Sequence, residues 1–391
     1  TYWMSEPLRA GINHKHQLYA EGGDKVLRYG IGLDYAGIEG VVKNSSREIF
    51  GGRIELIYRR ENVKFSNKLS AEYLKMENPI VSFREFALAN PYYRKTNVYG
   101  EIERYLERGF LGNLEEYNVQ NPLWDSKLKN YDKGSKWSIR NNFIVEWQLF
   151  PDLNFRTRLG LSKNMGREEK FYDPLHSLFD DSPKLKKGKY IYRNTDYLKY
   201  EGDITVNYGK LFADKHRINL VGGWNISALN QEIIGFSTVG FNSGDFNRPS
   251  FSGGYPEGGK PENFESKKRA TGFFFNGGYS YDNRYLTDFN YRLDGTSVFG
   301  ANRKFTDTWS LGVAWNISNE NFLQEMTEKI DRLKIRFSVG NPGNQNFDAY
   351  LSYTTYIFNE KFMNDFGNGV SILQWGNPEL MWQKTLDKNI G

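Results

Sequence analysis

Four histidines and several neighbouring acidic residues are the side chains in this sequence whose types suit metal binding or catalysis. His14 and His16 would share one face of a strand, since successive strand side chains point to opposite faces. No third ligand follows them at a spacing typical of a metal site. Acidic neighbours such as Glu115 and Glu116 are adjacent, which does not place two carboxylates on either side of a reacting bond. The chain has no cysteine, which excludes a thiol nucleophile and a cysteine-based zinc site. We therefore predict no catalytic residue, no metal site and no cofactor, and a protein that is not an enzyme.

A glycine-rich segment, 254–260 (GYPEGGK), satisfies most of the phosphate-loop pattern. Pro261 stands where that pattern has the Ser or Thr that binds magnesium, and we expect neither a buried strand before the segment nor a helix after it. We interpret the segment as a loop tip.

Two basic clusters, 184–189 and 267–269, stand apart in a chain with 52 basic and 47 acidic side chains. Nucleic-acid binding needs a continuous basic face with stacking aromatics, so we expect no nucleic-acid partner. The clusters are interpreted as solvated charge, with contacts to lipopolysaccharide phosphates as the alternative.

The composition indicates a folded, β-rich protein. Of 391 residues, 16% are aromatic and 39 are glycine. The mean hydropathy is low, at −0.67, yet so many aromatics supply the apolar surface that a disordered chain lacks. No run approaches the roughly 18 consecutive apolar residues of a membrane-spanning helix.

Apolar and polar residues alternate with a period of two along most of the chain. In residues 333–339 (LKIRFSV), for example, Leu, Ile, Phe and Val share one face, and Lys, Arg and Ser share the other. Many of the predicted strands are at least as long as the roughly 9–11 residues that a tilted strand needs to cross a bilayer. We expect about twelve strands: 14–20, 26–37, 52–60, 62–75, 136–149, 153–163, 197–208, 216–229, 268–281, 284–293, 305–317 and 332–340.

The predicted connections alternate between short and long. The short ones are 22–25, 61, 150–152, 209–215 and 282–283. The long ones are 38–51, 76–135, 164–196, 230–267, 294–304 and 341 onward. The connection 318–331 is the exception, because it should be short and contains a predicted helical turn at 322–326. Short turns at one end and long loops at the other are typical of an up-and-down transmembrane barrel.

The two faces of the predicted strands differ in chemistry. Aromatic residues mark the ends of the apolar face, as suits a membrane–water interface: Tyr29, Tyr35, Tyr58, Trp147, Tyr208, Trp224, Tyr285, Trp309 and Trp315. The opposite face carries charges: Arg28, Asp34, Arg53, Glu55, Arg59, Lys64, Lys68, Arg140, Glu146, Arg156, Arg158, Asp288, Arg292, Lys334 and Arg336. Asn67 and Asn141 fall on the apolar face, where we interpret them as marking a strand end or a change of register.

These patterns predict an all-β fold, a transmembrane antiparallel up-and-down β-barrel with short periplasmic turns and long extracellular loops, integral to the outer membrane. Charges so regularly spaced would be desolvated in a closed core, and they fit a wet lumen. Two alternatives stay open. One is a passive porin of twelve strands, and the other is a soluble, secreted glycan-binding β-protein.

The predicted long loops contain aromatics among many Asn, Gly and charged residues. Such a mixture at a barrel mouth suits a sugar face or peptide side chains, and it equally suits loop packing or a partner protein. The candidates for substrate contact are Trp124, Trp375, Tyr92 and Tyr93.

Residues 290–300 (NYRLDGTSVFG) and 309–317 (WSLGVAWNI) follow each other closely in the chain. They resemble the R-x-DGSS-x-FG stretch and the S-x-GW-x-I strand of SusC/RagA-like TonB-dependent outer-membrane transporters. Residues 333–345 resemble LK-x-R-x-S-x-G-x-x-GNQ, and 375–385 (WGNPELMWQKT) resemble NP-x-L-x-WE-x-T. Nearer the start, the stretch 22–42 is similar to the family's first barrel hairpin, and 90–93 (NPYY) to a segment of an outer loop. The departures are small: Thr296 for Ser, Gln383 for Glu, and an inserted Pro342.

The resemblance implies a 22-stranded barrel, of which residues 1–391 would supply about twelve strands. The family's plug domain, amino-terminal extension and last strands have no counterpart here, so we expect this chain to be part of a longer polypeptide. The implied function is TonB-dependent import of a bulky nutrient, an oligosaccharide or a peptide, across the outer membrane. The implied partners are a SusD-like surface lipoprotein, TonB through a segment outside this chain, the substrate, and outer-membrane lipid and lipopolysaccharide.

Overall fold

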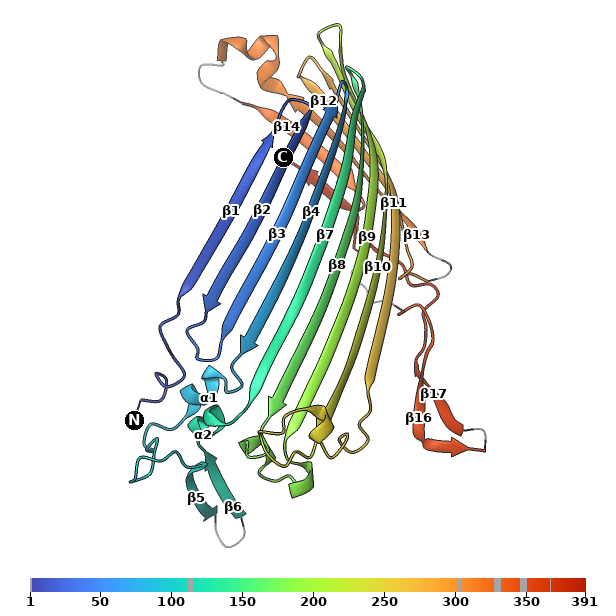
Figure 1. The fold of residues 1–391 in the computed structure, drawn as a ribbon. Coiled ribbons are helices and arrows are strands. Elements are labelled where there is room, and N and C mark those ends of the chain that lie inside the picture. The colour runs from blue at the N-terminus through green and yellow to red at the C-terminus, as the bar shows by residue number, and fades with distance from the viewer. Residues whose placement is uncertain are drawn as a thin grey trace.

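The computed structural model describes residues 2–111, 115–300, 302, 304–326, 332–344, 350–365 and 367–391. Among these residues, thirteen strands form one antiparallel sheet in which almost every strand pairs with its neighbours along the chain (Figure 1). The strands are β1 (Asn13–Gly23), β2 (Leu27–Glu39), β3 (Ser46–Arg60), β4 (Val63–Asn78), β7 (Tyr131–Phe150), β8 (Leu153–Tyr172), β9 (Lys189–Phe212), β10 (His216–Val239), β11 (Glu262–Tyr281), β12 (Tyr285–Thr296), β13 (Phe305–Asn316), β14 (Lys334–Gly340) and β19 (Asp387–Ile390). The sheet curves along its width, as the wall of a barrel does.

Smaller elements occupy the connections. Two hairpins are present, β5 (Tyr105–Leu111) with β6 (Glu115–Gln120) and β16 (Thr355–Asn364) with β17 (Gly367–Gln374). The short strands β15 (Gly343–Asn344) and β18 (Gln383–Lys384), which precede and follow the second hairpin, also pair with each other. The helices are α1 (Phe83–Leu88), α2 (Pro122–Lys127) and the 3-10 turns η1 (Ser177–Phe179), η2 (Lys184–Lys186), η3 (Pro249–Phe251), η4 (Ile317–Asn319) and η5 (Asn321–Met326). Within the described part of the chain, none of the helices is long and apolar enough to cross a membrane.

The connections alternate in length as predicted. One end of the sheet carries the turns after β1, β3, β7, β9 and β11, together with η4 and η5, and the other carries the longer loops with α1, α2 and the β5–β6 hairpin (Figure 1). We call these the turn end and the loop end. The predicted helical turn at 322–326 is confirmed, as η5. Gln345, part of one of the motifs, lies outside the described residues.

Two predictions about the strands were incomplete. The strands extend further toward the loop end than the apolar alternation does, to 24 residues each in β9 and β10, so the connection after β2 is 40–45 rather than 38–51. The extensions mix polar and apolar residues without a regular alternation, and they are held by the continuing hydrogen-bond ladder with their neighbours. The thirteenth strand, β19, has only four residues and no apolar alternation, so no sequence signal marks it.

The position of Asn67 and Asn141 corrects a prediction. Both lie inside their strands, and the pairing of β4 with β7 runs unbroken from Val63↔Trp147 to Asn78↔Asp132. They mark neither a strand end nor a register change. A pair of amides can stay on an apolar face when each satisfies the other, as these two do.

The sheet has no apolar core on its outward face. Side chains such as Leu159 (56% exposed) and Phe273 (52% exposed) stand free on it. Such a surface suits contact with lipid, and the predicted fold class, the wall of a transmembrane antiparallel barrel, is confirmed. Buried apolar clusters lie at the loop end instead: Trp3, Val81 and Phe86 form one, and Phe171, Tyr190 and Phe241 another.

Aromatic residues occupy two register rows on the outward face. Toward the loop end, Tyr35, Phe50, Tyr73 and Trp137 follow one another across β2, β3, β4 and β7; we call this the outer aromatic row. At the turn end, Tyr281, Tyr285 and Trp315 are paired in the same manner. On β7, Trp137 and Trp147 lie about ten residues apart, or roughly 26 Å along the membrane normal for a strand tilted by about 40°. That height matches the apolar band of about 25 Å expected of an outer-membrane barrel.

Candidate functional site

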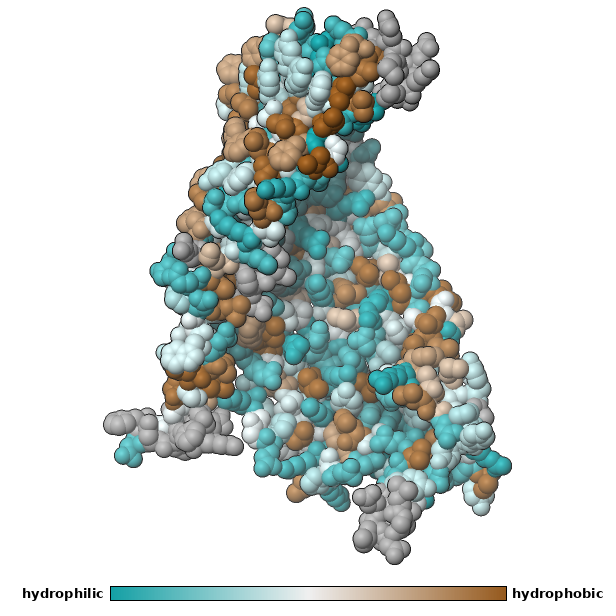
Figure 2. All heavy atoms as spheres, turned by 180° about the vertical axis from the view of Figure 1, so that it is seen from behind, coloured by the Kyte–Doolittle hydropathy of each residue, from teal (hydrophilic) through white to brown (hydrophobic). Residues whose placement is uncertain are grey.

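The inward face of the sheet is a hydrophilic wall. All the charged residues predicted for the inner face lie on it, because the strand register keeps them on one side. Many are paired across strands: Lys64 with Glu146 at 2.7 Å, Lys68 with Glu55 at 2.7 Å, and Arg158 with Asp203 at 2.6 Å. Seen from behind, the hollow of the molecule is lined mostly by hydrophilic residues (Figure 2). Such partly solvated pairs add little stability and keep the wall wet.

A recess of about 720 Å³ lies on this wall between β11, β12, β13 and β14. Its volume falls in the range of about 300–1,000 Å³ that small-ligand sites occupy. Asn276, Asn290 and Ser310 form one register row across it, and Asn290 donates a hydrogen bond to the Ser310 hydroxyl at 3.1 Å. Neutral amides and hydroxyls of this kind both donate and accept, as sugar hydroxyls and peptide groups require.

Glycines open the recess beside its charged side chains. Asp288 has Gly278 and Gly312 as its neighbours on both sides, and a Cβ on Gly312 would lie 2.7 Å from the Asp288 carboxylate. The carboxylate therefore leans over the glycine instead of a neighbouring side chain. Arg292 donates two hydrogen bonds to Asp294, at 2.9 and 2.7 Å, which fixes its guanidinium as a planar donor surface on the wall.

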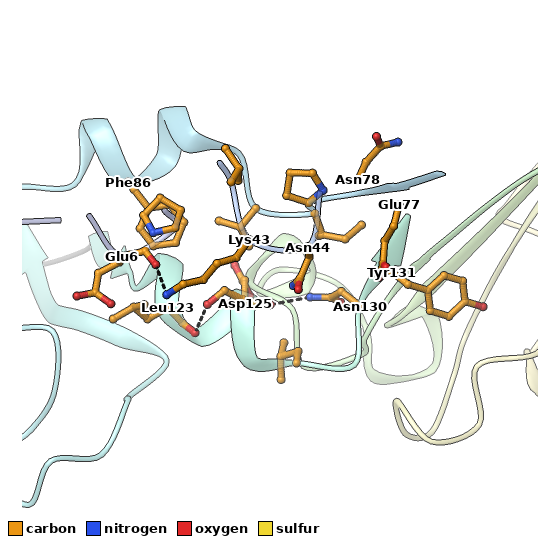
Figure 3. A pocket seen from close by; sticks show the side chains of 17 residues that line it. Glu6, Lys43, Asn44, Glu77, Asn78, Phe86, Leu123, Asp125, Asn130 and Tyr131 are labelled. Atoms are coloured by element: carbon orange, nitrogen blue, oxygen red, sulfur yellow. Dashed lines mark hydrogen bonds between the residues drawn. The ribbon is translucent and has the colours of Figure 1, made fainter. Parts of the chain in front are cut away.

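The loop end contains a second cavity, of about 190 Å³, shown in Figure 3. Lys43 Nζ donates to the Glu6 carbonyl at 2.7 Å, and Asn130 donates to the Asp125 carbonyl at 2.7 Å. The cavity is small for an organic ligand, and its polar groups are bonded to one another. It is a packing cavity that joins the amino-terminal segment to the long loop 79–130.

A buried polar cluster holds this loop to the next one. Asp125 accepts hydrogen bonds from the Ser177 backbone N–H, at 2.9 Å, and from the Ser177 hydroxyl. His176 Nδ1 lies 3.6 Å from Asp125 and accepts from the Leu178 N–H at 3.1 Å. The Ser177 hydroxyl therefore donates to the carboxylate and not to the imidazole, so these three residues are not a nucleophile–base relay. Sequence reasoning missed this cluster because Asp125 is more than fifty residues from His176 and Ser177 in the chain.

Burial shifts the pKa of His176. Desolvation lowers it below the ordinary value of 6.5, and the carboxylates of Asp125, Glu85, Asp173 and Asp180 oppose that shift. The neutral imidazole is the form that caps η1 through the Leu178 N–H.

The four aromatics predicted to contact substrate are all at the loop end, in different settings. Tyr92 is 93% exposed and Trp375 is 76% exposed. Trp124 lies in α2 and donates from Nε1 to the Leu175 carbonyl at 3.0 Å. Tyr93 packs against the Trp3 cluster and donates to Glu107, whose pKa is lowered by hydrogen bonds from Tyr93 and Tyr117. Substrate contact by these four stays a prediction.

The other sequence candidates are placed at the surface. His14 and His16 stand on the outward face with ring centroids 5.4 Å apart, beside Tyr35. No group of three or more metal-ligating side chains is found among the residues that the structure describes. The glycine-rich segment 254–260 belongs to the loop between β10 and β11 and leads into a strand, as a phosphate loop does not.

Comparison with known proteins finds similarity to TonB-dependent receptors. No family model matches it. It is 26% identical to the TonB-dependent receptor P39 of Formosa agariphila over 97% of this chain and 35% of the receptor. It is 25% identical to the TonB-dependent receptor SusC of Bacteroides thetaiotaomicron, over 100% of this chain and 40% of SusC. The chain thus spans less than half the length of these relatives.

Solved structures agree on the fold. The RagAB peptide transporter matches with a TM-score of 0.79 at 20% identity, over 100% of this chain and 43% of the transporter chain. The ferric citrate transporter FecA matches with a TM-score of 0.55 at 8% identity, over 97% of this chain and 46% of FecA. The resemblance to SusC/RagA-like TonB-dependent receptors is confirmed, and the predicted location in the outer membrane agrees with these findings.

Proposed function

We propose that this chain forms part of the wall of a transporter that imports a bulky nutrient across the outer membrane by a TonB-dependent mechanism. The observation that carries the proposal is the pairing of two surfaces on one sheet. The outward face is apolar and edged by aromatic rows, and the inward face is hydrophilic with an open recess. Similarity to receptors named as TonB-dependent supports the part of the proposal that TonB drives import.

The same resemblance implies three further parts of such a transporter: a plug, a segment that contacts TonB, and a partner lipoprotein. A plug that blocks the lumen, and the segment that contacts TonB, would belong to the rest of a longer polypeptide. A SusD-like lipoprotein at the loop end would hold substrate against the barrel mouth. The exposed rings of Tyr92 and Trp375 suit either that partner or the substrate itself.

The substrate class is an oligosaccharide or a peptide. The recess offers amide and hydroxyl groups from Asn276, Asn290 and Ser310 beside two carboxylates and one paired guanidinium. These groups match sugar hydroxyls and peptide amides, and they lack the concentrated charge that a metal chelate would need.

Uptake by cells that carry the full-length protein tests the proposal. Labelled oligosaccharides and labelled peptides are supplied to cells with TonB, to cells without TonB, and to cells treated with an uncoupler. We expect accumulation of one class that requires both TonB and the proton gradient. Uptake that persists in both deficient conditions would identify a passive porin instead.

A matched pair of variants tests the recess. Asn290→Leu with Ser310→Val removes polar groups from the inward face and should lower uptake about three- to tenfold, the effect of one or two lost hydrogen bonds. The control, Val313→Leu, lies on the outward face of the same strand, outside the lining of the recess, and should leave uptake unchanged. Equal uptake by the double variant and the control would show that the substrate does not bind in the recess.

A further inference from the structure

Two rows of charged residues lie directly beyond the outer aromatic row, on the same outward face. Continuing along the strands toward the loop end, the next register row is Glu48, Lys75, Ser135 and Arg167, on β3, β4, β7 and β8. The row after it contains Glu77, Lys133 and Glu169. The face thus changes from aromatic to charged within two residues on β3 and β4, and within four residues on β7.

The depth of these rows is that of lipid headgroups. They lie two and four residues from the aromatic row, or about 7 and 14 Å along the strand. For a strand tilted by about 40°, the two rows lie roughly 5 and 10 Å beyond the aromatic row along the membrane normal. The polar layer of a bilayer leaflet is about 5–8 Å thick, so the charged rows fall within it or at its outer edge.

Three cations gather around one buried carboxylate in these rows. Glu169 is 6% exposed, and its carboxylate pairs with Arg167, with Lys133 at 3.8 Å and with Arg248 at 3.8 Å. Arg248 belongs to the loop between β10 and β11, so it closes the cluster from outside the sheet. With Glu77, the register neighbour of Lys133, two carboxylates face three cations, and the cluster keeps one positive charge in excess.

A groove of about 580 Å³ lies over this cluster. It is lined by Lys75, Lys133, Arg167 and Arg248 together with the acidic residues Glu48, Glu77 and Glu169. Lys75 pairs with Glu48 at 3.3 Å, which leaves the three cations around Glu169 as the main positive centre. The cationic ends of Lys133, Arg167 and Arg248 are about half exposed and free to turn toward a ligand.

A buried acceptor in the same groove is unsatisfied. Glu169 Oε2 is enclosed by protein and has no hydrogen-bond partner among the described residues. A buried carboxylate oxygen without a donor is unfavourable by about 1–3 kcal/mol or more. A ligand that fits the groove should therefore bring a hydroxyl or amide donor as well as negative charge.

We propose that this groove binds a phosphorylated sugar headgroup of an outer-leaflet glycolipid, of the lipid A type. Lys133, Arg167 and Arg248 bind the phosphate, and the turn of Lys133 and Arg248 toward it uncovers Glu169 Oε2, which then accepts a hydrogen bond from a sugar hydroxyl. A lipid is the occupant because the groove continues the membrane-facing surface past its aromatic row, where a headgroup lies whenever its acyl chains contact the wall below.

The full-length protein, purified in detergent, allows a direct test by native mass spectrometry. The probes are bisphosphorylated lipid A and the same lipid after enzymatic removal of its phosphates. We expect retention of the phosphorylated form only. The triple variant Lys133→Gln, Arg167→Gln, Arg248→Gln should lose retention by roughly ten- to a hundredfold, as expected for charge-assisted contacts.

The matched control removes the same charge from the opposite face of the same sheet. Lys64→Gln, Lys68→Gln and Arg140→Gln lie on the inward face of β4 and β7 and should retain the lipid as the unmodified protein does. The single variant Arg248→Gln changes a loop residue outside the strands and should show a smaller loss in the same direction. It keeps the test valid if the triple variant does not fold.

Each contrary outcome overturns the proposal. Retention that survives in the triple variant, or falls equally in the control, would show that the groove is not the site. Equal retention of dephosphorylated lipid would remove the phosphate contact. Displacement of the lipid by millimolar inorganic phosphate would identify a site for free anions. Because the readout is lipid retention, its failure would leave nutrient uptake and its own test unaffected.

Discussion

Asn67 on β4 and Asn141 on β7 exchange two side-chain hydrogen bonds on the apolar, outward face of the sheet. Asn67 Nδ2 donates to Asn141 Oδ1 at 3.2 Å, and Asn141 Nδ2 donates to Asn67 Oδ1 at 3.1 Å. An unpaired amide exposed to hydrocarbon is strongly unfavourable, whereas a reciprocal pair satisfies one donor and the acceptor of each side chain. The pair links two strands that are separated in the chain by the long loop 79–130.

Replacing one asparagine of the pair should lower the free energy of unfolding more than replacing both. Asn67→Leu leaves Asn141 without its partner in lipid, and we expect a loss of about 1–3 kcal/mol in the free energy of unfolding. The double variant Asn67→Leu, Asn141→Leu should regain most of that loss, because leucine suits the lipid face. Urea unfolding of the full-length protein in lipid vesicles measures both values.

Asn142→Leu serves as the comparison, since Asn142 is the neighbour of Asn141 on the inward face of β7. If the double variant is as unstable as the sum of the two single variants, the hydrogen-bonded pair contributes nothing beyond two separate side chains.

The turn between β9 and β10 contains an alanine in a conformation that favours glycine. Ala213 has φ of 46° and Asp214 has φ of 56°, both in the left-handed region. Alanine there is less stable than glycine, so Ala213→Gly should raise the free energy of unfolding by about 1 kcal/mol. Thermal unfolding in detergent would detect the gain as a higher midpoint. Ala228→Gly, inside β10, is the control and should lower the midpoint instead.

Acid should loosen the contact between the loops around His176. Its pKa is lowered in the folded state, chiefly by burial, so the unfolded loop binds a proton more readily than the folded one. The stabilisation is complete above the ordinary value of 6.5 and falls as the pH drops below it. Hydrogen exchange of peptides 121–128 and 173–182, corrected for the intrinsic effect of pH, should show less protection at pH 5 than at pH 8.

His176→Asn gives the control for that experiment. Asparagine can still accept a hydrogen bond at the start of η1, and it does not titrate in this range. Its protection should be the same at both pH values. A variant that loses protection at pH 5 as the unmodified protein does would assign the effect to another group.

A methyl group on Gly312 should alter transport more than stability. A Cβ there would lie 2.7 Å from Asp288 Oδ2, the mobile end of a side chain that can turn into the lumen. We expect Gly312→Ala to change uptake severalfold and leave the thermal midpoint nearly unaltered. Gly222→Ala is the matched control, since a Cβ at Gly222 meets no atom within 4 Å, and it should change neither quantity.

The sequence predicted the barrel wall well because each strand repeats a pattern that the membrane imposes. Apolar residues such as Leu159 must face lipid and charges such as Arg158 must face water, so a period of two is visible without any tertiary information. The resemblance of residues 290–300 to known receptors added the family. β19 was not predicted because its four residues, three polar ones followed by Ile390, carry no such pattern.

The loop end was less predictable, because its contacts join residues that lie far apart in the chain. Trp124 and Tyr93 look like exposed ligand-binding aromatics in the sequence, yet Trp124 bonds to Leu175 and Tyr93 to Glu107. The cations around Glu169 come from β7, β8 and the loop after β10, so no local run of basic residues in the sequence predicts the cluster.

The length of β10 has a consequence for how charged molecules reach the entrance. Past Ala228 its outward face is mostly polar, so roughly ten of its 24 residues stand above the membrane, adding about 25 Å of rigid wall. The Debye length at physiological ionic strength is about 8 Å. The rim thus lies some three screening lengths above the phosphates of the leaflet, and their negative potential has decayed by then. An acidic nutrient and a neutral one should arrive at the mouth equally fast, and any discrimination between them has to be made by the rim and the wall.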